Sequence, residues 1–183
     1  MGSADYIVTR LGIEELSARW KAAVGDRALA KLPYKFEMDR WGNLVMTPPA
    51  NVRHSDVQGS LMIALQTALG GRARAEFAVV TAAGVLVPDV VWCSPEYVGR
   101  NRAAFSGDVA AAPEAPELCV EVKSASNSLG ELKDKLDAYL AAGALEGWIV
   151  LEDLAVRIFG GKGEQDASSF AFDLAQWRSQ FRL

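Results

Sequence analysis

Residues 117–123 read Glu117-Leu118-Cys119-Val120-Glu121-Val122-Lys123. Apolar side chains recur here at every second position, which predicts a β-strand with Leu118, Val120 and Val122 on one face. Glu121 and Lys123 then share the opposite face. Charges within an otherwise core-like strand are costly to bury unless they are paired or bound to a metal ion. This strand is therefore the first candidate for a functional site.

A second apolar run is interrupted by a charge in the same way. It reads Val85-Leu86-Val87-Pro88-Asp89-Val90-Val91-Trp92. Pro88 has no N–H group for a central ladder, so it favours the start or the edge of a strand, with Asp89 beside it. Asp89, Glu121 and Lys123 are thus the positions at which the predicted strands lose their apolar character.

The Glu-x-Lys spacing alone is weak evidence, because a chain of this composition is expected to contain about one such triplet by chance. A second one, Glu131-Leu132-Lys133, falls in a predicted helix. Residues two apart on a helix point in different directions, so that triplet carries no site. The evidence for a site comes from Asp89 and from the strand context of Glu121.

These residue types match what metal-assisted hydrolysis of a phosphodiester requires. Mg²⁺ takes oxygen ligands and is usually held by one or two carboxylates, together with waters and phosphate oxygens. A divalent cation also relieves the repulsion between two neighbouring carboxylates. A lysine beside them can orient the attacking water or stabilise developing negative charge. The alternative is a buried ion pair between Lys123 and Asp89 or Glu121.

Periodicity along the rest of the chain predicts an α/β fold. Helices are predicted from about residue 13 to Gly25, from about residue 55 to Gly70 and from residue 129 to Gly143. Strands are predicted over 34–38, 44–46, 76–80, 85–92, 118–122, 148–151 and 156–159. This order indicates a mixed β-sheet core flanked by α-helices. A length of 183 residues fits one domain, residues 1–183, with its core at about 10–160.

Charge and hydropathy restrict the function classes. The longest apolar stretch, 84–93, is too short to span a bilayer, and the N-terminus has no secretory signal pattern. We therefore expect a cytoplasmic protein without membrane contact. A net charge of -4 disfavours a general polyanion binder, although a nuclease needs positive charge only along its substrate groove. His54 is the only histidine, which excludes a histidine-rich metal cluster.

Several segments form an ordered series along the chain. They are Lys35-Phe36-Glu37-Met38, Gly42-Asn43-Leu44-Val45-Met46-Thr47-Pro48, Arg53-His54, Pro88-Asp89-Val90-Val91, Ala115-Pro116-Glu117-Leu118-Cys119-Val120-Glu121-Val122, and Lys135-Leu136-Asp137-Ala138-Tyr139-Leu140-Ala141-Ala142-Gly143. In order and spacing, the series resembles the putative restriction endonuclease-like family of the PD-(D/E)xK nuclease superfamily. The resemblance covers roughly residues 10–160.

This resemblance implies a restriction endonuclease-like fold and an endodeoxyribonuclease that depends on Mg²⁺ or Mn²⁺. It implies that Asp89 and Glu121 bind the metal, that the backbone carbonyl of Val122 assists, and that Glu37 is a further acidic residue of the site. Many relatives lack a lysine two residues after the glutamate and use one from the following helix, at the position of Lys135. Lys123 is the first candidate for the catalytic lysine, and Lys135 is its rival.

The expected partners are DNA and a second copy of the chain, because two cuts in a duplex are often made by two subunits. Two other functions stay open on the sequence. One is a catalytically inactive nucleic-acid-binding or assembly module that keeps a nuclease fold. The other is a metal-dependent phosphodiesterase that acts on RNA or nucleotides.

Overall fold

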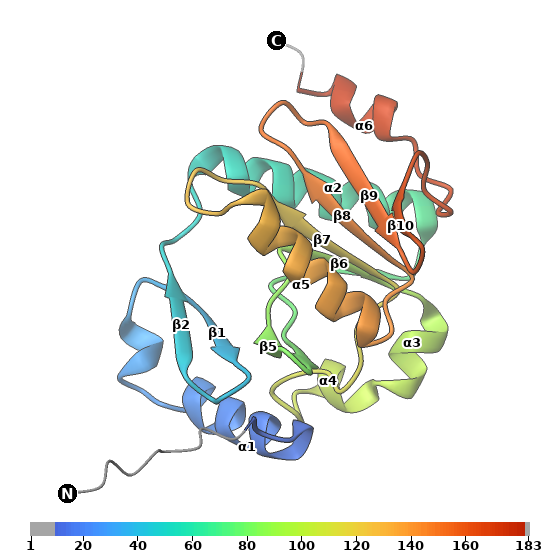
Figure 1. Cartoon of the computed structure of the whole chain (residues 1–183). Helices are drawn as coiled ribbons and strands as arrows, with labels where there is room; N and C mark the ends of the chain where they lie inside the picture. Colours follow the sequence, from blue (N-terminus) through green and yellow to red (C-terminus); the bar gives the residue numbers. More distant parts are fainter. Residues whose placement is uncertain (1–9, 182–183) are drawn as a thin grey trace, which may run out of the picture.

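The structure is a computed structural model that describes residues 10–181, and Figure 1 shows their arrangement. The helices are α1 (Ile13–Val24), the 3₁₀ turn η1 (Leu29–Lys31), α2 (Val52–Leu69), α3 (Pro95–Arg100), α4 (Arg102–Ser106), α5 (Leu129–Ala141) and α6 (Leu174–Ser179). The strands are β1 (Lys35–Asp39), β2 (Leu44–Thr47), β3 (Arg72–Ala75), β4 (Val79–Thr81), β5 (Gly84–Leu86), β6 (Val90–Cys93), β7 (Leu118–Val122), β8 (Glu146–Val150), β9 (Val156–Gly160) and β10 (Gly163–Gln165). Among these residues, no helix is long and apolar enough to cross a membrane.

The strands form two sheets. The larger sheet has the order β10-β9-β8-β7-β6-β3, and the smaller one has the order β2-β1-β5-β4. Only β7 and β8 pair in parallel in the larger sheet, and α5 is the crossover between them. The remaining pairs in that sheet are antiparallel. The predicted mixed α/β core is confirmed.

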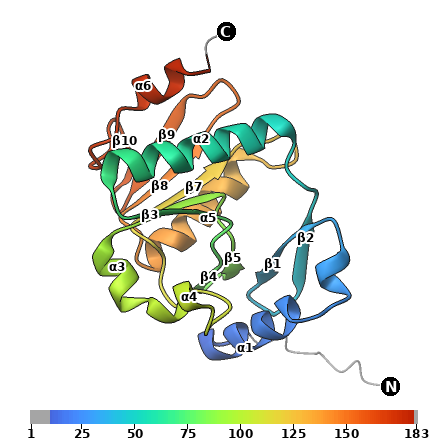
Figure 2. The same ribbon diagram turned by 180° about the vertical axis from the view of Figure 1, so that it is seen from behind.

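Helices cover both faces of the larger sheet. α5 lies over one face in Figure 1, and α2 lies over the opposite face in Figure 2. The alternation predicted for β7 decides which side chains meet which helix. Leu118, Val120 and Val122 join the core cluster that contains Leu61 of α2. Cys119 joins the cluster with Leu132, Leu136 and Tyr139 of α5. Glu121, two residues after Cys119, therefore faces α5.

The predicted strand over 85–92 is two strands, and this expectation of a single strand was wrong. β5 belongs to the smaller sheet and β6 to the larger one, with Val87-Pro88-Asp89 between them. Pro88 has no N–H group to continue a ladder, so the pairing stops and the chain changes sheets. Asp89 consequently lies at the junction of the two sheets, directly before β6.

Other boundaries also differ from the predictions. α2 begins at Val52 rather than near residue 55, because the Asn51 side chain caps it by accepting a hydrogen bond from the His54 N–H at 2.9 Å. The predicted strand over 76–80 is replaced by β3 and β4, which lie on either side of Glu76, a residue with φ 50°. Between β6 and β7, where no helix or strand is predicted from the sequence, the chain forms α3 and α4. β10 and α6, which follow Gly160, were not predicted from the sequence.

Glu146 of β8 is a buried carboxylate far along the sheet from the junction. Its side chain accepts hydrogen bonds from the Trp148 indole at 2.9 Å, the Ser168 hydroxyl at 2.7 Å, and the Ser169 N–H and hydroxyl at 2.6 Å each. Burial alone would raise the pKa of Glu146, but the hydrogen bonds from Ser169, Ser168 and Trp148 lower it below its usual range. This carboxylate ties the segment after β10 to the sheet.

Glu146→Gln is expected to lower the free energy of unfolding by about 2 kcal/mol at neutral pH, because an amide NH₂ faces donors that need an acceptor. A depressed pKa stabilises the fold above the unfolded value of about 4.3, and this contribution is lost as the pH falls through the folded value. Urea denaturation at pH 7 and pH 3 would measure the difference between wild type and variant. The difference should shrink at pH 3, and an equal difference at both pH values would contradict the role given to the carboxylate.

Candidate active site

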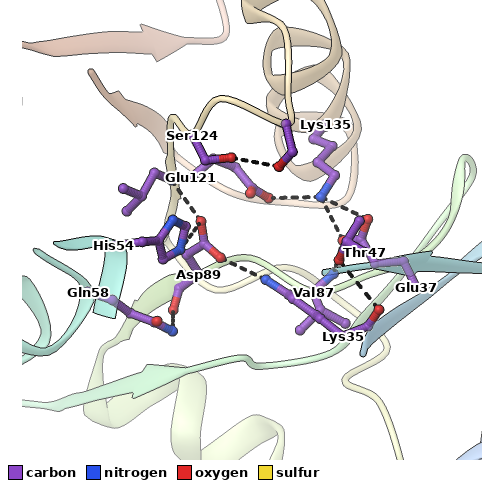
Figure 3. Close-up of polar contacts among 12 residues, drawn as sticks. Lys35, Glu37, Thr47, His54, Gln58, Val87, Asp89, Glu121, Ser124 and Lys135 are labelled. Carbon is purple, nitrogen blue, oxygen red and sulfur yellow. Dashed lines mark hydrogen bonds and ion pairs between the residues drawn. The ribbon is translucent and has the colours of Figure 1, made fainter. Parts of the chain in front are cut away.

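Asp89 lies at the centre of a polar cluster where the two sheets meet, as Figure 3 shows. β6 and β7 pair with Val90 opposite Val120, so the next pair of the antiparallel ladder places Asp89 beside Glu121. Asp89 is 5% exposed. Its Oδ2 accepts a hydrogen bond from the Val122 N–H at 2.8 Å, and its Oδ1 lies 2.7 Å from Lys35 Nζ.

Two residues of α2 also hold Asp89. His54 Nε2 lies 3.3 Å from Asp89 Oδ2, and the Gln58 side-chain amide donates to the Asp89 carbonyl at 2.7 Å. Burial alone would raise the pKa of Asp89. Hydrogen bonding to His54 and the charge of Lys35 outweigh burial and hold this pKa well below its usual range. Asp89 is therefore ionised at neutral pH.

Glu121 is the most deeply buried carboxylate of the cluster, at 2% exposure. The Tyr139 hydroxyl of α5 donates to Glu121 Oε1 at 2.7 Å, and Lys135 Nζ lies 3.7 Å from the same oxygen. Burial raises the pKa of Glu121 to about 7, even though the charge of Lys135 opposes the rise; the charge of Asp89 contributes to it. A cation close to this carboxyl group would stabilise its ionised form.

Glu37 and Lys135 join the cluster from opposite sides. Glu37 of β1 is 6% exposed, and its Oε1 accepts a hydrogen bond from the Val87 N–H at 2.8 Å. Lys135 Nζ lies 2.8 Å from the Glu37 carboxylate, and Figure 3 shows this side chain reaching from α5 toward the acidic groups. Burial alone would lower the pKa of Lys135, but Glu121 and Glu37 outweigh it and raise this pKa to about 12. Lys135 is therefore positively charged at neutral pH.

Lys123 makes its contacts elsewhere. Its Nζ donates to the Ser124 carbonyl at 2.5 Å and lies 3.7 Å from Glu152 Oε1. Glu152 follows β8 and is largely exposed. The structure thus brings together four of the predicted site residues, Asp89, Glu121, Glu37 and Lys135, with the backbone of Val122. Of the two lysines, Lys135 is the one in contact with the carboxylates.

Sequence reasoning missed four residues of this cluster: Lys35, Gln58, Tyr139 and the side-chain role of His54. Two signals were present. Lys35 lies two residues before Glu37 on a predicted strand, so the two side chains had to share a face. Gln58 lies one helical turn after His54, and both therefore point the same way from α2. Only the fold, however, places these faces against Asp89.

The donor groups fit a hard divalent cation. Carboxylate oxygens of Asp89 and Glu121 and the carbonyl of Val122 are the oxygen ligands that Mg²⁺ and Mn²⁺ accept, and two carboxylates suffice. Within residues 10–181, no group of three or more His, Cys, Asp or Glu side chains is arranged to hold a metal ion. Ammonium groups contact these carboxylates instead, Lys35 at Asp89 and Lys135 at Glu37.

Two hollows in the described part of the chain lie away from this cluster. One of about 260 Å³ is lined by α1, η1 and the β1–β2 hairpin, and a groove of about 930 Å³ runs between α2 and α6. None of Glu37, Asp89 and Glu121 lines either of them. At the cluster itself the side chains of Lys35 and Lys135 remain 20% and 25% exposed.

Comparisons with known proteins agree with this architecture. A crystal structure of "a putative nuclease belonging to DUF820 from Anabaena variabilis ATCC 29413" matches with a TM-score of 0.61 and 19% sequence identity. The match covers 84% of this chain and 90% of the other. None of the curated proteins compared with this chain matches it. The model of the Uma2 family, described as "Putative restriction endonuclease", matches residues 27–175. The chain belongs to the Uma2 family of putative restriction endonucleases.

Proposed function

We propose that this protein is an endonuclease that hydrolyses DNA phosphodiester bonds with Mg²⁺ or Mn²⁺. The observation that carries the proposal is the convergence of three buried carboxylates, Glu37, Asp89 and Glu121, with the charged Lys135 at the junction of the two sheets. Burying several charged groups close together lowers the stability of a fold. Such groups are found mainly at sites where they act on a ligand. Membership of the Uma2 family, whose description is "Putative restriction endonuclease", supports the same function.

Asp89, Glu121 and the Val122 carbonyl would hold the cation. A bound Mg²⁺ or Mn²⁺ supplies Lewis acidity toward the phosphate and lowers the pKa of a coordinated water. The Val122 N–H, 2.8 Å from Asp89 Oδ2, and the Tyr139 hydroxyl, 2.7 Å from Glu121 Oε1, orient the two carboxylates. Groups of this kind around the ligands tune how strongly they bind a metal.

Hydrolysis forms one bond from a water oxygen to phosphorus and breaks one bond from phosphorus to a deoxyribose oxygen. The water loses one proton and the leaving oxygen takes one up. Lys135 is placed to donate to the negative charge that grows on the phosphate oxygens, or to orient the attacking water. Glu37 holds the Lys135 ammonium in position at 2.8 Å. We assign the catalytic lysine to Lys135 rather than Lys123, because Lys135 contacts Glu37 and Glu121, whereas Lys123 contacts Glu152 outside the cluster.

Tyr139→Phe is expected to weaken Mn²⁺ binding by roughly 10- to 100-fold, the range found when a group that orients a ligand is removed. The phenylalanine keeps the ring that packs in the α5 core and loses only the hydrogen bond to Glu121. Calorimetric titration of wild type and variant would measure the change. Equal affinities would show that Tyr139 does not position Glu121 for a cation.

Conversion of supercoiled plasmid DNA tests the proposal as a whole. Purified protein should nick or linearise the plasmid in MgCl₂ or MnCl₂ and should leave it intact in EDTA. Protein that binds DNA and metal but never cuts would instead indicate an inactive binding module. Cleavage of RNA but not DNA would show that RNA, rather than DNA, is the substrate.

We also propose that the protein is a homodimer, which would place one active site on each strand of a DNA duplex. Analytical ultracentrifugation would measure the oligomeric state.

A further inference from the structure

Lys35 has no part in the mechanism above, yet it makes the shortest contact with the Asp89 carboxylate. Its Nζ lies 2.7 Å from Asp89 Oδ1, within the cluster where a cation would bind. The other carboxylate oxygen, Oδ2, is taken by the Val122 N–H and faces His54. An incoming divalent cation therefore meets Asp89 at the oxygen that Lys35 already contacts.

An ammonium ion and a divalent cation cannot share that position at low energy. Like charges a few ångströms apart repel strongly in a partly buried site. Ammonium groups already lie against all three carboxylates, Lys35 at Asp89 and Lys135 at Glu37 and Glu121. Lys35 thus neutralises Asp89 in the absence of a metal ion.

Lys35 is also able to leave Asp89. Its side chain is 20% exposed, and a lysine stem is flexible enough to move the ammonium group by several ångströms. Three carboxylates with two ammonium groups carry at most one net negative charge. A divalent cation added to them makes the cluster net positive, which suits the binding of a phosphodiester.

We propose that Lys35 is an internal counter-cation that occupies Asp89 until a divalent cation binds, and that it is then released toward the phosphodiester. The inference rests on the proposed function, because it requires a cation at Asp89 and Glu121. It adds a residue that opposes metal binding and assists substrate binding. A lysine that served only to hold the fold together would do neither.

The test is calorimetric titration of MnCl₂ into the full-length protein at pH 8, where Asp89 is ionised. Lys35→Met, which keeps the aliphatic stem, is expected to bind Mn²⁺ at least about tenfold more tightly than wild type, because one repelling charge is gone. Lys35→Arg keeps the charge and should stay within about threefold of wild type. Lys31→Met, at an exposed lysine of η1, is the matched control and should not change the affinity. Plasmid cleavage by Lys35→Met at saturating Mn²⁺ should fall although the metal is bound.

The outcomes separate this inference from the proposed function. Unchanged or weaker Mn²⁺ binding by Lys35→Met, with Asp89-dependent binding by wild type, would overturn the role of Lys35 and leave the metal site standing. Absence of Mn²⁺ binding in both proteins would overturn both proposals.

A second measurement needs no variant. Amine labelling of wild-type protein, mapped by mass spectrometry, should show Lys35 becoming at least threefold more reactive when MnCl₂ is added. Unchanged or lower reactivity of Lys35 at saturating Mn²⁺ would overturn its release from Asp89.

Discussion

Glu121→Gln is expected to lower plasmid cleavage by roughly 10³-fold or more, since loss of a metal ligand removes several kcal/mol of transition-state stabilisation and each 1.36 kcal/mol is a factor of ten. The glutamine has nearly the same volume, so the packing against α5 is kept. The Tyr139 hydroxyl can still donate to the amide oxygen. Asp89→Asn should have an effect of the same size, for the same reason. Initial rates of plasmid nicking in MgCl₂ measure both.

The chain offers a matched control for this substitution. Glu146 lies on β8, the neighbour of β7, and is as deeply buried as Glu121, with 2% exposure for each. Glu146→Gln therefore makes the same chemical change in the same sheet, outside the cluster. It should lower stability and leave cleavage within about twofold of wild type below its melting temperature. Cleavage by Glu121→Gln at the level of Glu146→Gln would contradict the assignment of the site.

Lys135→Met is expected to lower the rate constant of cleavage by about 10²- to 10³-fold, the usual effect of removing one donor that stabilises transition-state charge. Lys123→Met is the paired comparison and should keep cleavage within about threefold. The reason is geometric: Lys135 Nζ lies 2.8 Å from Glu37 and 3.7 Å from Glu121, whereas Lys123 contacts Ser124 and Glu152.

Single-turnover cleavage at saturating DNA and metal separates this role from binding. The Lys135 variant should bind DNA and Mn²⁺ and fail in the chemical step. The reverse ranking, with Lys123→Met inactive and Lys135→Met active, would return the role to the lysine of the Glu-x-Lys triplet. It would also show that α5 only packs against the site.

Local patterns predicted several of the strands, among them the one over 118–122, for a physical reason. A period of two in 118–122 decides which side chains meet α2 and which meet α5, so Glu121 had to face a helix. Pro88 favoured the start or the edge of a strand beside Asp89, and β6 begins directly after Asp89, at Val90. The prediction of one strand over 85–92 was wrong because apolar periodicity does not show that a chain changes sheets.

The lysines could not be ranked from sequence. Lys123 is two residues from Glu121 along the chain, but the register of α5 over β7 brings Lys135 to the carboxylates. That register depends on contacts such as those of Leu132 and Leu136 with β7 and β8, which no spacing within one strand reports. Lys35 and Gln58 reach Asp89 over separations of 54 and 31 residues and were missed for the same reason.

The most direct test of the central claim is a crystal structure of the protein soaked with MnCl₂, read by anomalous diffraction. We expect one strong peak with ligands from Asp89, Glu121 and the Val122 carbonyl at about 2.0 to 2.3 Å, close to the distances that hard divalent cations take to oxygen. Lys35 should have moved away from Asp89 Oδ1. A peak whose ligands come from other residues would contradict the proposal that Asp89 and Glu121 bind the metal ion. The absence of any peak at these two residues at saturating MnCl₂ would contradict it as well.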